Sequence, residues 1–120
     1  MRRVRVTGPA RRDISHILKL SHYEFGAYAR QRYRELIEQA IRDIAEDFSR
    51  IGVKAIDDVR QGYSIYHLKW SRERAAGHPV KRPRHVIAFY VDDSGAIILA
   101  RVFHDRQLLN RHLPESGSER

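Results

Sequence analysis

The sequence contains no cysteine, only one tryptophan and one methionine among its 120 residues, and no long hydrophobic run. The absence of cysteine excludes disulfides, thiolate nucleophiles and zinc sites built on sulfur. No apolar run approaches the roughly 20 residues of a membrane-spanning helix, and the opening MRRVRVTGPARR lacks the apolar stretch of a secretory signal. We therefore expect a soluble, cytoplasmic protein with no membrane association and no redox chemistry.

Positive charge is abundant, since 23 lysines and arginines against 15 acidic residues give a net charge of +8. Residues 1–34 carry nine basic and two acidic side chains. Residues 35–58 carry three basic and seven acidic ones, and residues 59–113 carry ten basic and four acidic ones. A basic field of this size favours anionic partners, which are RNA, DNA or an acidic protein. Because 42% of the residues are apolar, the chain can bury a core. We expect one domain over residues 1–113 and a disordered tail over 114–120.

The hydrophobic pattern predicts a strand, two helices and three further strands, in that order. Alternating Arg and Val indicate a strand over residues 2–7, and Pro9 suits the first turn of a helix capped by Thr7 or Gly8. In the second helix apolar residues recur at steps of three and four from Ala29 to Ile51, and Gly52 ends it.

Three apolar segments toward the end of the chain are typical of strands, at roughly residues 62–70, 85–91 and 96–104. The turn DDSG joins the last two, and the polar, basic segment 71–83 reads as an exposed loop. The sequence therefore predicts an α+β fold, in which an N-terminal strand and a helical hairpin pack with a three- to four-stranded, mainly antiparallel sheet, the hairpin on one face.

The strands at 85–91 and 96–104 are apolar on both faces. Such strands need cover on both sides, and two helices can cover only one. We therefore expect an exposed apolar face that awaits a partner. The alternative is that the N-terminal arm, the long loop and the residues after 104 fold over this face.

Four segments resemble the toxin subunits of the RelE/ParE superfamily of bacterial toxin–antitoxin modules: TGPARRDI (7–14), FGAYARQRYRELIEQAIRDIAE (25–46), RHVIAFYV (84–91) and IILARVFHD (97–105). The chain is most similar to the ParE branch, often named plasmid stabilisation proteins. The resemblance covers most of residues 4–113 in the right order. It implies a RelE/ParE-like fold and a cognate antitoxin that wraps the toxin.

The implied antitoxin is an acidic, ParD-like protein whose docking part is disordered until it binds. Such a partner fits the basic balance of this chain and the expected apolar face. We therefore assign the antitoxin contact to apolar residues of the two long strands: Ile87, Phe89, Ile97, Leu99 and Phe103.

The superfamily divides on mechanism. RelE-like members resemble ribosome-dependent ribonucleases that cut mRNA, whereas ParE-like members bind and inhibit DNA gyrase. A ribonuclease needs an acid, a base and cations around the phosphate, and the candidates here are His67, His85, Arg101 and His104. Strand alternation places Arg101 and His104 on opposite faces unless the strand bends, and no tyrosine follows Tyr90.

We favour a binding inhibitor, for which the resemblance implies DNA gyrase as the target, with no catalytic residue and no cofactor. The basic end of the chain is then the target-binding region: Arg101, His104, Arg106, Arg111 and His112. For Arg101 an ion pair with Asp13 is an equally supported alternative, and His104 suits a local hydrogen bond at a strand end. The histidine spacings show no helical ligand pair, so we expect no metal site.

Six cations bracket Trp70 and the long loop: Lys69, Arg72, Arg74, Lys81, Arg82 and Arg84. Cations beside an aromatic ring can follow a phosphate backbone and stack a base. Charged loops are more often simply solvated, and a lone tryptophan more often packs. Direct nucleic-acid binding is therefore a minor alternative.

Overall fold

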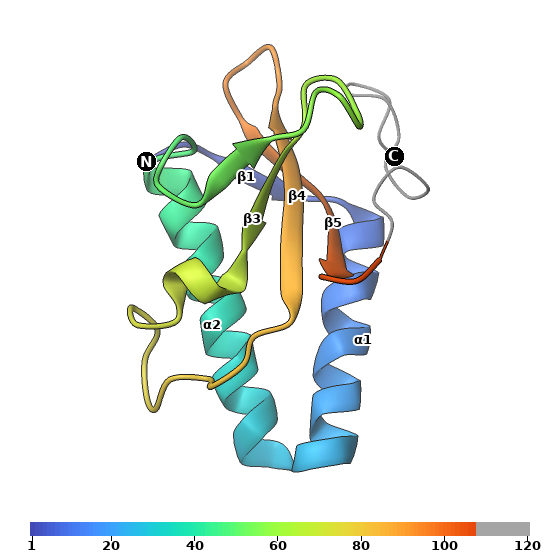
Figure 1. Ribbon diagram of the computed structural model, residues 1–120, viewed down its shortest axis with the longest axis vertical. Helices are drawn as coiled ribbons and strands as arrows, with labels where there is room; N and C mark the ends of the chain where they lie inside the picture. Colours follow the sequence, from blue (N-terminus) through green and yellow to red (C-terminus); the bar gives the residue numbers. More distant parts are fainter. Residues whose placement is uncertain (108–120) are drawn as a thin grey trace.

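The computed structural model of the protein describes residues 1–107, and its elements follow the predicted order (Figure 1). They are β1 (Val4–Val6), α1 (Gly8–Phe25), α2 (Ala27–Glu46), β2 (Val53–Ala55), β3 (Ser64–His67), the 3₁₀ helix η1 (Leu68–Ser71), β4 (His85–Val91) and β5 (Ile97–His104). The predicted α+β class is confirmed. The predicted target-binding residues Arg111 and His112, and the predicted tail over 114–120, lie outside the described residues.

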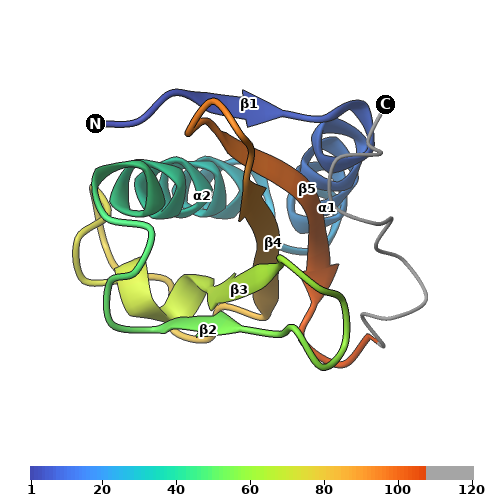
Figure 2. The same ribbon diagram turned by 90° about the horizontal axis from the view of Figure 1, so that it is seen from above.

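The strands form one mixed sheet in the order β1-β5-β4-β3-β2. Only β1 and β5 are parallel, and the other neighbours are antiparallel. The sheet curves around α2, as the view from above shows (Figure 2). It has one strand more than predicted, because β2 is three residues long and too short to reveal an alternating pattern. The predicted strand over 62–70 is likewise shorter, since residues 68–71 turn into η1.

The first helix begins as the sequence predicts. The Thr7 hydroxyl accepts a hydrogen bond from the backbone N–H of Ala10 at 3.2 Å and donates one to the carbonyl of Ala100 at 3.0 Å. Thr7 therefore caps the helix and ties its start to β5. The helix ends at Gly26, whose φ of 95° separates α1 from α2.

The second helix ends at Glu46, five residues before the predicted end at Ile51. Asp47 adopts an extended conformation, and its side chain accepts hydrogen bonds from the backbone N–H and the hydroxyl of Ser49, each at 3.0 Å. This local turn competes with the helix although the apolar spacing continues. Ile51 is 75% exposed, so it is not part of the buried stripe.

The prediction of an exposed apolar face is wrong. Four of the five residues assigned to the antitoxin contact face the helical hairpin and lie in the main core, where each is at most 1% exposed: Ile87, Phe89, Ile97 and Leu99. The helices cover the very side of the sheet that these residues occupy. Side chains so deeply buried cannot present a docking surface.

Phe103, the fifth of these residues, points to the other face because β5 contains a bulge. Ala88 pairs with Arg101 and Phe89 pairs with Leu99, which leaves Ala100 as the extra residue and shifts the alternation after it. Phe103 is 1% exposed in a second core cluster that includes Ile56 and Tyr63. The segment between β2 and β3 thus covers the face that was expected to be bare. Neither described helix is long and apolar enough to cross a membrane.

Candidate functional site

A cleft of about 990 Å³ lies between the helical hairpin, the segment before β4 and the end of β5. The hairpin extends past the sheet at this end of the molecule (Figure 1). Apolar side chains from both helices and from the neighbouring segment contribute to its lining: Ile17, Leu20, Phe25, Ala29, Val80 and Val102. Leu20 is 46% and Phe25 73% exposed, so a binding partner could bury both.

Cations line the same cleft, and they outnumber the acids. Its lining contains five Lys and Arg side chains and only two acidic ones, Asp13 and Glu24. The cations are Arg32, Lys81, Arg82, Arg84 and Arg101. Arg32 donates hydrogen bonds to the carbonyls of His78 (2.9 Å) and Pro79 and so ties the long loop to α2. The lining of the cleft therefore combines apolar side chains with an excess of positive charge.

Arg101 forms the predicted ion pair with Asp13. Its Nε lies 2.7 Å from Asp13 Oδ2 and its Nη2 3.0 Å from Oδ1, a two-point contact between β5 and α1. β1 pairs with β5 only as far as Leu99, so the arginine side chain can pass the edge of the sheet to reach the helix. Arg101 and His104 consequently both line the cleft, although simple alternation separates them.

His85 stands directly opposite His104 in the β4–β5 pair, and their rings meet edge to face with centroids 5.5 Å apart. The Tyr33 hydroxyl lies 2.6 Å from His85 Nδ1 and accepts a hydrogen bond from the backbone N–H of Arg84. Burial, helped by the charge of His104, lowers the pKa of His85 to about 4. Burial also raises the pKa of Tyr33 to about 12. At neutral pH this pair is therefore uncharged.

His67 joins this cluster through an acid. Its Nε2 lies 3.1 Å from Asp105 Oδ2, and Arg84 Nε lies 3.6 Å from the same oxygen. Burial alone would raise the pKa of Asp105, but the hydrogen bond from His67 and the charge of Arg84 hold it below its usual value. Asp105 thus offsets part of the positive charge at this end of the sheet.

The structure brings together three of the four residues named for a ribonuclease, His67, His85 and His104, while Arg101 binds Asp13. The sequence reasoning missed Tyr33 and Asp105 as members of this cluster. Tyr33 fits the apolar stripe of the second helix. Its hydroxyl group was the one sign in the sequence that this residue also needs a hydrogen-bond partner. Arg106 follows the cluster and is exposed. Among residues 1–107 no group of three or more potential ligands is arranged to hold a metal ion.

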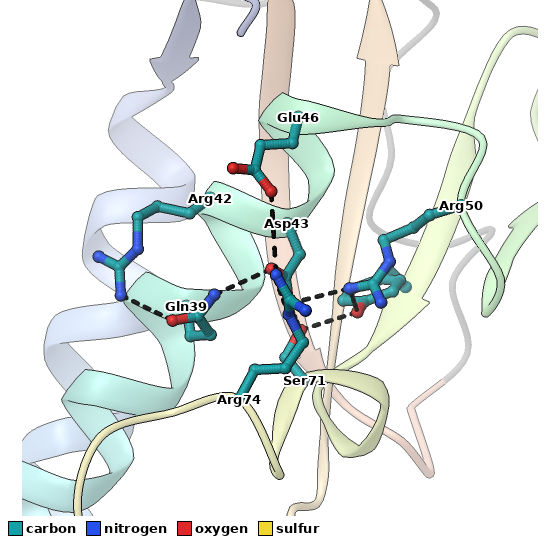
Figure 3. Close-up of polar contacts among 8 residues, drawn as sticks. Gln39, Arg42, Asp43, Glu46, Arg50, Ser71 and Arg74 are labelled. Carbon is teal, nitrogen blue, oxygen red and sulfur yellow. Dashed lines mark hydrogen bonds and ion pairs between the residues drawn. The ribbon is translucent and has the colours of Figure 1, made fainter.

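A second polar cluster surrounds Asp43 of α2, which is 2% exposed (Figure 3). Its carboxylate accepts hydrogen bonds from Ser71 at 2.5 Å and Gln39 at 2.9 Å and pairs with Arg50 and Arg74 at 2.8 and 2.9 Å. Burial opposes ionisation, yet the hydrogen bonds from Ser71, Gln39 and Arg74 and the charge of Arg74 hold the pKa of Asp43 below its usual value. The cluster fixes η1 and the turn after α2 against the helix.

The family model described as the ParE toxin of the type II toxin–antitoxin system parDE matches residues 4–109 of the chain. This range contains all the described strands and helices and the whole cleft. Comparison with curated proteins finds no match.

Proposed function

The chain belongs to the ParE toxin family of type II toxin–antitoxin systems, and from this premise we propose that it stops growth in the cytoplasm by binding DNA gyrase. The proposal includes an acidic antitoxin that neutralises it. It makes the protein a binding inhibitor. The observation that carries it is the position of Arg101 and His104, two of the proposed target-binding residues, in the lining of the cleft.

The chemistry of the cleft supports an acidic antitoxin segment as its occupant. Apolar residues on one side of such a segment would bury Leu20 and Phe25, and carboxylates on its other side would meet Lys81, Arg82 and Arg84. Opposite charges on the two partners speed their encounter and fix the register of the complex. The antitoxin surface therefore lies on the cleft in this proposal, in place of the buried strand residues.

Neutralisation then follows from overlap. Arg101 and His104 line the cleft, and Arg106 comes two residues later on an exposed turn. An antitoxin segment seated in the cleft covers the first two and crowds the third, so gyrase cannot reach them. Arg111 and His112 belong to the same proposed target-binding set.

The test is a supercoiling assay, in which antitoxin-free protein is titrated into gyrase and relaxed plasmid, with a second topoisomerase as control. We expect a dose-dependent loss of supercoiling or an accumulation of cleaved plasmid. Arg106→Ala should weaken the inhibition, whereas the matched Arg11→Ala change on the exposed side of α1 should leave it unchanged. Undiminished supercoiling with a folded sample would contradict gyrase as the target.

A second candidate function, ribosome-dependent cleavage of mRNA, is favoured by one observation. His85, which is neutral at pH 7, faces His104 and lies beside Tyr33 and Arg84, so a proton acceptor lies next to a cation. If the protein cleaves RNA, translating ribosomes should yield cut mRNA, and His85→Gln and His104→Gln should abolish the cuts. Intact mRNA under growth arrest would remove this candidate.

A further inference from the structure

Trp70 lies outside the cleft and is the only tryptophan of the chain. It sits in η1 and is 43% exposed, although a tryptophan usually buries most of its surface. The sequence alone favoured a packing role for this residue. Its exposure needs another explanation, because an apolar ring of this size gains free energy when it is covered.

The ring is seated directly on Gly52, in the turn between α2 and β2. A Cβ atom at Gly52 would lie 2.5 Å from Trp70 Cγ and within 2.8 Å of two further ring atoms. No other residue type leaves room for this contact, so the tryptophan rests against bare backbone on one side. The ring is thereby held in place while part of it faces solvent.

The Asp43 cluster orders the two segments that hold the ring, which are η1 and the turn that contains Gly52. Figure 3 shows the contacts of Asp43 with Ser71 and Arg50. Ser71, next to Trp70 in η1, donates to Asp43 Oδ2 at 2.5 Å, and Arg50, two residues before Gly52, pairs with the same oxygen at 2.8 Å. Arg50 also donates to the Tyr66 hydroxyl at 2.8 Å. One buried carboxylate thus orders both segments that position the exposed ring, which lowers the entropy lost when a ligand binds it.

One cation lies beside this ring, and others lie on the segments that hold it. The ammonium of Lys69 lies 5.5 Å from the ring centroid, and Lys54 is exposed two residues after Gly52. Arg72 donates to the carbonyl of Lys81 at 3.3 Å, which holds the basic end of the long loop near η1. Two acids of this region form ion pairs, Glu73 with Arg72 at 3.4 Å and Glu46 with Arg74 at 3.9 Å.

We propose that Trp70 and the cations Lys54 and Lys69 form a binding site for single-stranded nucleic acid, with a base stacked on the ring and phosphates on the cations. A fixed aromatic ring with basic side chains around it is the chemistry that single-strand binding uses, and stacking is tolerant of sequence. A duplex keeps its bases stacked on one another and cannot offer a free base to the ring. The site is independent of the cleft and of gyrase binding.

The single tryptophan provides the test, because its fluorescence reports only on this site. Full-length protein is titrated at low salt with an oligothymidylate and an oligouridylate of about ten nucleotides, with a duplex of the same length, and with a heparin fragment of similar charge. We expect quenching by either single strand, weaker quenching by the duplex and none by heparin. The two single strands distinguish DNA from RNA. Absence of quenching by both, or equal quenching by heparin, would overturn base stacking.

Variants locate the site, with binding followed by the anisotropy of a labelled single strand. Trp70→Leu should lower the affinity at least about fivefold, and Trp70→Phe should retain part of it. Lys69→Gln should reduce the slope of log affinity against log salt by about 0.7, whereas Lys19→Gln on α1 should not change it. Unfolding midpoints check that each variant is folded. Unchanged affinity in folded Trp70→Leu would overturn the site, and capture of a protein partner there without nucleic acid would do the same.

Discussion

Asp13 of α1 holds Arg101 of β5 at two points, and the same carboxylate also accepts a hydrogen bond from the backbone N–H of Val102 at 2.9 Å. The two side chains are 16% and 25% exposed, so the pair is largely shielded from solvent. One carboxylate therefore joins the first helix to the last described strand, and both residues of the pair line the cleft.

Removing this carboxylate should destabilise the fold. We expect Asp13→Ala to lower the free energy of unfolding by about 1–3 kcal/mol, because a partly buried guanidinium and an N–H group lose their acceptor. Urea denaturation at pH 7 measures the loss, and Glu38→Gln, an exposed acid on α2, is the control. A double-mutant cycle with Arg101→Ala should show coupling, and independent, additive effects would contradict a direct pair.

Stability should fall as the pH drops from about 7 to 4. The pKa of His85 is about 4 in the folded protein, chiefly through burial, against 6.5 for an ordinary histidine. As the pH falls, His85 therefore binds a proton in the unfolded chain before it does so in the folded protein. The contribution of neutral His85 to the free energy of unfolding is complete above pH 6.5 and decreases by about 2–3 kcal/mol as the pH drops to 4. The neighbours His67, Arg84 and His104 oppose the charge, while Asp105 favours it.

His85→Gln should flatten this profile, since glutamine does not titrate. Urea unfolding between pH 4 and 7.5, with His16→Gln on α1 as the matched histidine control, separates the effect from that of other groups. An identical pH slope in His85→Gln and the unmodified protein would show that His85 is not the titrating group.

Gly52→Ala should be more costly than an ordinary glycine replacement. The position has a φ of +99°, and the added methyl group would meet the Trp70 ring at 2.5 Å. We expect a loss of about 2–3 kcal/mol and a shift in Trp70 emission as the ring leaves its seat. Gly77→Ala is the matched control, because it shares a positive φ of 77° but meets its nearest atom, Glu35 Oε1, only at 3.7 Å. Equal losses in the two variants would mean that the ring contact contributes nothing.

Phe25→Glu should weaken antitoxin binding if the antitoxin occupies the cleft. Phe25 lines the cleft and is 73% exposed, so the change adds a repelling charge without opening the core. We expect at least about tenfold weaker binding of the antitoxin encoded beside the gene, measured by calorimetry. Tyr23→Glu is the control, since Tyr23 is 86% exposed but does not line the cleft. Both variants should inhibit growth in the absence of antitoxin.

Much of the fold could be predicted from periodicity and capping. Thr7 and Pro9 mark the start of α1 by their local chemistry, and the structure confirms this start. The end of α2 could not be read this way, because the turn at Asp47 and Ser49 interrupts a stripe whose spacing continues. Local hydrogen bonds decided that boundary against the hydrophobic pattern.

The site was harder to predict because it depends on a bulge. Ala100 has no distinguishing chemistry, yet as the extra residue in β5 it turns Phe103 toward the second core and leaves Arg101 able to reach Asp13. The contact between Tyr33 and His85 was also hard to predict, because the two residues lie more than 50 positions apart in the sequence. Pairings of this kind follow from the tertiary structure and leave no mark in the local pattern.

The parallel pairing of β1 with β5 joins residues near the start of the chain to residues 97–99. The N–H of Ile97 bonds the carbonyl of Arg3 at 2.9 Å, and the N–H of Thr7 bonds that of Leu99 at 3.1 Å. Contacts between such distant segments form slowly, and here they cannot form on the ribosome until β5 has left the exit tunnel. The sheet is therefore complete only after β5 has emerged, so a chain interrupted before residue 97 lacks the strand that lies between β1 and β4.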